Sequence, residues 1–163
     1  MYLSFRRAGL PLLAVLLLAW QGRPPRGGGA NKYDACRLLT VGDVTVLLGE
    51  GTASTLTQGG QNCTWRSDGK MKLMVRTPES TRTKPEVSFE QYKTGPHRDY
   101  TIADEKELGD HAVSAITPFG VEFMVLKKDR ILYVQYFGPY GMKGTPEMLA
   151  RARPVMKKAV DAF

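Results

Sequence analysis

Both cysteines of this chain, Cys36 and Cys63, lie within residues 33–65, and their pairing state constrains the fold more than any other sequence feature. They stand 27 positions apart without histidines nearby, so they lack the ligand spacing of a zinc site. The remaining choices are a structural disulfide and a reactive thiol. Because disulfides persist mainly in oxidising compartments, the choice depends on where the protein folds.

The N-terminus is typical of a secretory signal. The opening MYLSFRR carries two arginines and no acidic residue, and an apolar run follows at residues 8–20. A transmembrane helix needs about 20 apolar residues, and Pro11 interrupts this shorter run, so an uncleaved anchor is the weaker interpretation. We expect cleavage after Ala30, where small residues occupy the positions that a signal peptidase reads, with a site nearer Gly22 as the alternative.

These features divide the chain into two parts. Residues 1–30 are the predicted signal peptide with its Gly/Pro/Arg-rich cleavage region, and residues 31–163 form a single predicted domain, secreted or periplasmic, without a stable transmembrane anchor after cleavage. Cys36 lies 16 positions beyond Trp20, whereas a lipid-modified cysteine would follow the apolar run directly. An exported chain with two such cysteines favours a structural disulfide over a reactive thiol.

The charge distribution does not favour nucleic-acid binding. The net charge of +7 includes four arginines in the leader, and without them 19 Lys and Arg face 16 Asp and Glu, which leaves +3. The remaining cations are scattered among acids rather than gathered in a stripe, so the electrostatic footprint of a nucleic-acid binder is missing.

Hydrophobic periodicity predicts the elements of the first half of the domain. Thr40 is a good N-cap, Asp43 suits the first helical turn, and Gly49 is a good stop, which predicts a short amphipathic helix over residues 40–48. The elements expected after it are a possible edge strand at 51–57, a hairpin of strands 62–66 and 70–77 around the turn 67–69, and a helix at 85–93.

In the second half of the domain, the sequence pattern predicts a long charged surface connection over residues 97–110. An antiparallel meander of strands 112–117, 121–127 and 130–137 is expected after it. The last strand is apolar on both faces, which predicts a central strand covered on both sides. Thr145 and Pro146 begin a C-terminal amphipathic helix, which Pro154 should kink or split. The fold class is therefore α+β, an antiparallel sheet packed by a short N-terminal helix, a middle helix and a C-terminal helix.

The pattern D-A-C-R-L-L-T-x-x-D-V-x-x-L-L-G, followed by C-T-W, resembles small secreted proteins related to the actinobacterial lipoproteins of unknown function. The resemblance covers residues 34–65 by motif and the rest by layout only. It implies a Cys36–Cys63 bridge and an exported α+β domain. This chain departs from the lipoproteins because no lipid-accepting cysteine follows its apolar run, and the resemblance implies no chemistry.

No pattern in the sequence predicts a catalytic residue, a cofactor or a metal site. His97 and His111 flank an acidic segment that could hold a cation or supply an acid and a base, but a solvated loop is favoured because EF-hand spacing and paired-histidine helices are missing. The aromatic residues of the last strand could line a pocket for an apolar ligand, although core packing is favoured for them. Tyr140, in the loop after that strand, is the best candidate for an exposed contact.

The sequence therefore predicts a non-catalytic binding or interaction module of the cell envelope, with Tyr140, His97 and His111 as the possible contact surface. Its partner would be an envelope protein or a small ligand. The alternatives are a small hydrolase or metal-dependent enzyme that uses residues 97–111, and a carrier of an apolar small molecule.

Overall fold

The computed structural model describes residues 34–67, 71–78, 83–138 and 142–163. The predicted leader and its cleavage site, most of the predicted 67–69 turn, and Tyr140 lie outside these residues.

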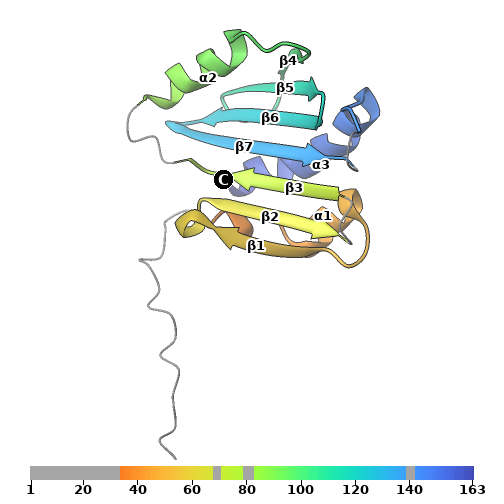
Figure 1. The fold of residues 1–163 in the computed structure, drawn as a ribbon. Helices are drawn as coiled ribbons and strands as arrows, with labels where there is room; N and C mark the ends of the chain where they lie inside the picture. The colour runs from red at the N-terminus through yellow and green to blue at the C-terminus, as the bar shows by residue number, and fades with distance from the viewer. Residues whose placement is uncertain (1–33, 68–70, 79–82, 139–141) are drawn as a thin grey trace, which may run out of the picture.

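The described strands form one antiparallel sheet in the order β1-β2-β3-β7-β6-β5-β4 (Figure 1). Its strands are β1 (Ala53–Thr57), β2 (Asn62–Ser67), β3 (Met71–Arg76), β4 (Thr101–Glu105), β5 (His111–Thr117), β6 (Gly120–Lys127) and β7 (Arg130–Phe137). The predicted hairpin, the meander and the central position of the last strand are confirmed, and so is the α+β class.

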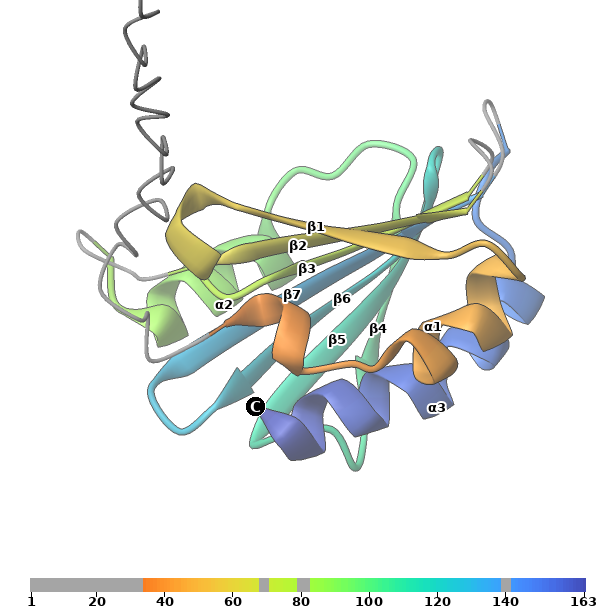
Figure 2. The ribbon, with the colours of Figure 1, turned by 90° about the horizontal axis from the view of Figure 1, so that it is seen from below.

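Helices pack on both faces of the sheet. One face carries α1 (Val41–Leu48), α3 (Pro146–Ala162) and the 3₁₀ turn η1 (Ala35–Arg37), which lie beneath the strands in Figure 2. The main core lies there, where Phe123, Leu132 and Tyr136 are almost fully buried. The opposite face carries α2 (Pro85–Thr94), whose Phe89 packs in a smaller cluster with Val113, Leu126 and Ile131.

The predicted helix over 40–48 forms as α1, and a reciprocal cap explains where it begins. The Thr40 hydroxyl accepts a hydrogen bond from the Asp43 backbone N–H, and the Asp43 carboxylate accepts from the Thr40 backbone N–H. The same carboxylate lies 2.5 Å from Lys158 Nζ on α3. Asp43 therefore both caps α1 and ties it to α3.

Acid should weaken this tie. Hydrogen bonds from Lys158 and then from Thr40 lower the pKa of Asp43 to about 2. A folded pKa below the unfolded value gives stability that is complete above about pH 4 and is lost as the pH falls towards 2. We expect the free energy of unfolding to fall over that range by about 1 kcal/mol more in the wild type than in Asp43→Asn, because the pair is partly solvated. Urea unfolding at both pH values measures this, and equal losses in the two proteins would contradict it.

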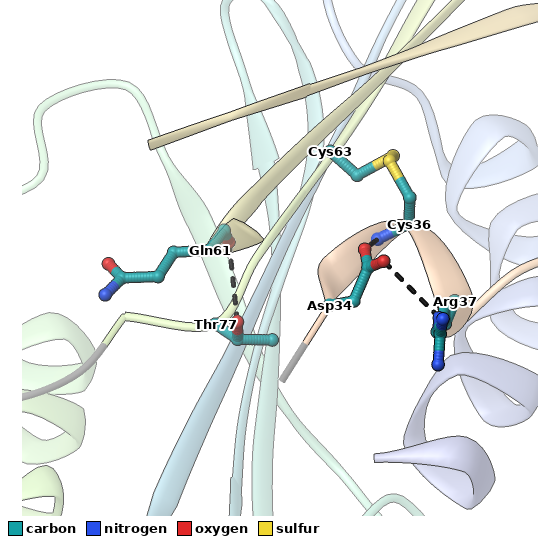
Figure 3. The surroundings of a disulfide bond; sticks show 6 residues. All are labelled: Asp34, Cys36, Arg37, Gln61, Cys63 and Thr77. Atoms are coloured by element: carbon teal, nitrogen blue, oxygen red, sulfur yellow. Dashed lines mark hydrogen bonds and ion pairs between the residues drawn. A yellow bond between two sulfur atoms is a disulfide. The ribbon is translucent and has the colours of Figure 1, made fainter. Parts of the chain in front are cut away.

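The disulfide between Cys36 and Cys63 is present, with 5.0 Å between the two Cα atoms (Figure 3). It fastens η1 to β2. The Asp34 carboxylate caps η1 by accepting a hydrogen bond from the Cys36 backbone N–H, 2.9 Å away, and it pairs with Arg37. Trp65, two residues along β2 on the same face, is buried as predicted.

Helix α3 begins at the predicted N-cap, Thr145, whose hydroxyl accepts a hydrogen bond from the Met148 N–H. It runs unbroken to Ala162, so the expectation that Pro154 could split it is wrong. Pro154 and Ala150, whose carbonyl loses its helical partner, are both exposed. Water can satisfy that carbonyl, which makes the proline tolerable here.

The prediction of an irregular connection over 97–110 is also wrong, because residues Thr101–Glu105 form the edge strand β4, paired with β5. Ion pairs on both faces hold it: Asp104 contacts Lys93 of α2 at 2.6 Å, and Glu105 contacts Arg153 of α3 at 2.9 Å. Because charged residues interrupt the alternation of apolar and polar residues, a hydrophobicity pattern does not predict this strand. The charged residues also serve to close this edge of the sheet against further pairing.

Helix α2 covers only part of its face of the sheet. Its cluster reaches β4, β5, β6 and the start of β7, whereas no described helix packs over β1, β2 and β3 on this side. The predicted cover on both sides of β7 is therefore only partial, and Phe137 at its end is half-exposed. We call the uncovered area the open face; its side chains on the first three strands are Ala53, Thr55, Thr57, Asn62, Thr64, Arg66, Lys72, Met74 and Arg76.

Candidate functional site

The two histidines of the predicted contact surface do not share a site. His97 stacks on Tyr100, with 5.0 Å between ring centroids, and its Nε2 lies 2.6 Å from the Tyr92 carbonyl oxygen. Because a carbonyl can only accept, Nε2 carries a proton and is engaged. His111 is exposed at the start of β5, and its ring lies 6.2 Å from that of Phe89. Each histidine thus packs against a different turn of α2.

Three of the acids between these histidines, Asp104, Glu105 and Asp110, are also held in contacts of their own. Beyond the ion pairs of Asp104 and Glu105, Ser114 donates a hydrogen bond to Glu105 at 2.6 Å, and Asp110 accepts one from the Lys128 backbone N–H. The segment lines a shallow hollow of about 380 Å³ that also touches α2. Among the described residues no group of three or more His, Cys, Asp or Glu side chains is placed to hold a metal ion.

The aromatic residues of β7 do not line one common pocket. Tyr136 lies in the main core, 1% exposed, and its hydroxyl donates to the Leu47 carbonyl at 3.1 Å. Tyr133 is three positions away, so it faces the α2 side of the sheet. A cavity beside both rings, which an apolar carrier would need, conflicts with this alternation.

The structure reveals a buried carboxylate that sequence analysis missed. Glu122 of β6 is 5% exposed on the α2 side. It accepts hydrogen bonds from the hydroxyls of Tyr92 and Tyr133, at 2.8 and 2.5 Å, and from the Gln135 amide at 2.8 Å. Gln135 is its direct cross-strand partner on β7, and the rings of Tyr92 and Tyr133 meet edge to face.

These three donors come from α2 and β7, so Glu122 joins the helix to the centre of the sheet. Burial, together with the Glu122 charge, raises the pKa of Tyr92 and of Tyr133 above the ordinary tyrosine value. Both hydroxyls therefore stay protonated and keep donating. The Glu122 carboxylate is covered and already accepts three hydrogen bonds, which favours an anchoring role over acid–base chemistry.

The open face brings together three cations that no sequence pattern groups. Arg66 of β2 is the direct cross-strand partner of Lys72 on β3, and Arg76 follows four residues along β3, about 13 Å away. Lys72 Nζ lies 4.8 Å above the Phe137 ring, and the Arg76 guanidinium lies 5.9 Å from the Tyr133 ring. Aromatic rings of β7 thus border the cations on one side.

Among the described residues, no carboxylate forms an ion pair with this group. The strands β1, β2 and β3 contain no acidic residue, and none of the ion pairs among the described residues includes Arg66, Lys72 or Arg76. Partial burial lowers the pKa of Lys72, and the charges of Arg66 and Arg76 lower it further. The three cations repel one another, so an anion placed over them would be stabilised.

The signal for this surface was present in the sequence but needed the strand register to be read. The alternation of apolar and charged residues in 70–77 places Lys72 and Arg76 on the solvent side of the hairpin, yet nothing in the local sequence shows that Arg66 lies opposite Lys72. Nor does the local sequence show that none of the described helices covers these cations. The cations looked scattered along the chain because cross-strand pairing brings them together only in the folded sheet.

None of the helices in the described ranges is long and apolar enough to cross a membrane. In the comparisons with known proteins, no protein-family model, no curated protein and no solved structure matches this chain. The resemblance to the actinobacterial lipoprotein relatives therefore stays a prediction.

Proposed function

We propose that this protein is an exported, non-catalytic binding module of the cell envelope, and that it recognises an anionic partner through its open face. The observation that carries the proposal is the grouping of Arg66, Lys72 and Arg76 on a sheet surface where, within the described ranges, no helix covers them and no acidic side chain pairs with them. Cations are usually dispersed among acids on a protein surface, so such a group favours a ligand of opposite charge.

The other features agree with this proposal. The Cys36–Cys63 disulfide suits an oxidising compartment, and the predicted leader would deliver the chain there. A sheet face gives a rigid platform, because the strands fix the spacing of the cations before any partner arrives. His97, Asp104 and Glu105 are held in internal contacts, and no observation favours an enzyme that uses residues 97–111.

Binding to a soluble polyanion tests the proposal. We expect the exported protein to bind dextran sulfate in low salt and to release it in high salt, because exposed charges are screened. The triple variant Arg66→Gln, Lys72→Gln, Arg76→Gln should bind at least about tenfold more weakly, since each exposed ion pair contributes roughly 0.5 kcal/mol or more. Isothermal titration calorimetry measures the difference.

A matched control removes the same charge elsewhere. Lys106, Lys128 and Lys157 are exposed and lie outside the open face, so their triple replacement by glutamine should leave most of the binding intact. Equal losses in the two triple variants would mean that only net charge matters, and the open face would not be the recognition surface.

A further inference from the structure

The cations Arg66 and Lys72 lie at one end of the sheet. The register places Arg66, Lys72, Phe137 and Gly120 in one row across β2, β3, β7 and β6. The β2 and β7 arrows both point to this end in Figure 1. The row is the last one before the β5–β6 turn and before the segment that leads from β7 to α3, so these connections lie at the same end of the sheet as the cations.

Two large apolar side chains project from these connections. Phe119 of the β5–β6 turn is 65% exposed, and Met142 of the segment before α3 is 45% exposed. They belong to adjacent strand ends, because Gly120, directly after Phe119, pairs with Phe137 at the end of β7. Lys143, directly after Met142, is exposed as well and adds a cation to this end.

Close contacts and hydrogen bonds hold the connections at this end. A Cβ on Gly138 would lie 2.8 Å from the Met142 sulfur, which shows that the Met142 side chain packs against Gly138. The Phe119 N–H donates to the Thr117 hydroxyl oxygen at 3.1 Å. The Gly144 N–H donates to the Thr117 carbonyl at 2.9 Å and ties the segment to the end of β5. Phe119 and Met142 therefore lie at the same end of the sheet as Arg66 and Lys72.

The combination of exposed apolar side chains and cations at one end of the sheet indicates the chemical class of the partner. A hydrophilic polyanion would contact Arg66 and Lys72 but would gain little from Phe119 and Met142. An anionic bilayer suits both kinds of group, since its headgroups attract cations and the boundary of its acyl chains takes up apolar side chains. Aromatic and basic residues are commonly found together at such interfaces.

We propose that the anionic partner is a phospholipid surface, which this end of the sheet meets with Phe119 and Met142 inserted and with Arg66, Lys72 and Lys143 on the headgroups. This inference rests on the proposed function, because it identifies the partner of the open face. The contact is peripheral and reversible.

Vesicle binding by the exported, processed protein tests the inference. Vesicles of phosphatidylglycerol mixed with phosphatidylcholine should sediment the protein, and vesicles of phosphatidylcholine alone should bind it far more weakly. Arg66→Gln with Lys72→Gln should weaken the binding by about 30-fold, because each cation near an anionic bilayer contributes about fivefold. Phe119→Ala with Met142→Ala should weaken it roughly tenfold.

Two controls distinguish insertion of Phe119 and Met142 into the bilayer from nonspecific hydrophobic binding. Val46 and Val87 are 69% and 45% exposed on α1 and α2, so Val46→Ala with Val87→Ala removes exposed apolar surface elsewhere and should bind like the wild type. Phe119→Trp provides a direct readout, since its fluorescence should shift to the blue when the side chain enters the bilayer. The second tryptophan of the domain, Trp65, is buried and should not respond.

The outcomes distinguish this inference from the proposed function. If Phe119→Trp shows no shift, or if the Phe119→Ala, Met142→Ala protein binds vesicles like the wild type, the membrane contact is wrong. If dextran sulfate binding still depends on the open face, the proposed function stands and its partner is a soluble polyanion or an acidic protein. If neither vesicles nor dextran sulfate bind, both proposals fail.

Discussion

Replacing Cys36 and Cys63 together by alanine is expected to lower the free energy of unfolding by about 3–4 kcal/mol, because the bridge closes a loop of 27 positions in the unfolded chain. For a domain of this size the loss corresponds to a fall of roughly 10–15 °C in melting temperature. Urea titration of both proteins measures it. Cys63 is fully buried and sits between well-packed strands, so alanine is preferred to serine, which would bury a hydroxyl.

The location of the effect is as informative as its size. The bridge fastens η1 to β2, while α1 and α3 are held by their own packing and by the Asp43–Lys158 pair. Hydrogen exchange should therefore quicken first at Ala35 and the residues around it, with β6 and β7 still protected. Treatment of the wild type with a reductant is the matched control and should reproduce the alanine result. A loss below about 1 kcal/mol in both would show that the bridge constrains the unfolded chain little.

Local sequence signals were sufficient to predict most of the helices and strands. Thr40 with Asp43 marked the start of α1, and Thr145 with Pro146 marked the start of α3, because a cap depends only on neighbouring residues. The meander was predictable since its strands are apolar and its turns are short. Strand β4 was missed for the opposite reason: Asp104 and Glu105 make it look like a loop, and the ion pairs that hold it reach residues far along the chain.

The candidate sites could not be predicted, because each depends on register or on what a helix leaves uncovered. Arg66 and Lys72 are separated by a turn, and their pairing exists only in the hairpin. Glu122 lies in an otherwise apolar strand, and alternation places its side chain on the other face from Val121 and Phe123, which no local pattern identifies as buried. That face became buried only when α2 folded over it and brought Tyr92 to the carboxylate.

Glu122→Ala is expected to cost about 3 kcal/mol of folding free energy, the second large effect. The change removes the acceptor of three hydrogen bonds, so the donor groups of Tyr92, Tyr133 and Gln135 are left without it in a partly apolar surrounding. Hydrogen bonds to a charged group contribute more than neutral ones, and the half-buried hydroxyls can recover part of the loss from water. Because Tyr92 is the link from α2, the helix should loosen before the sheet does.

The Glu122→Gln variant distinguishes the contribution of the side chain's shape to folding stability from the contribution of its charge. The amide has almost the same size, but it presents one carbonyl oxygen and one NH₂ group to three donors, so at least one donor faces another donor. We expect a loss of about 1–2 kcal/mol, between the wild type and alanine. Tyr92→Phe, which removes a single donor, should cost about 1 kcal/mol. Chemical unfolding of the three variants, with hydrogen exchange over α2, measures the series. If alanine and glutamine both cost less than about 0.5 kcal/mol, within the range of an ordinary surface substitution, then Glu122 does not anchor α2 and the packing of Phe89 alone holds the helix in place.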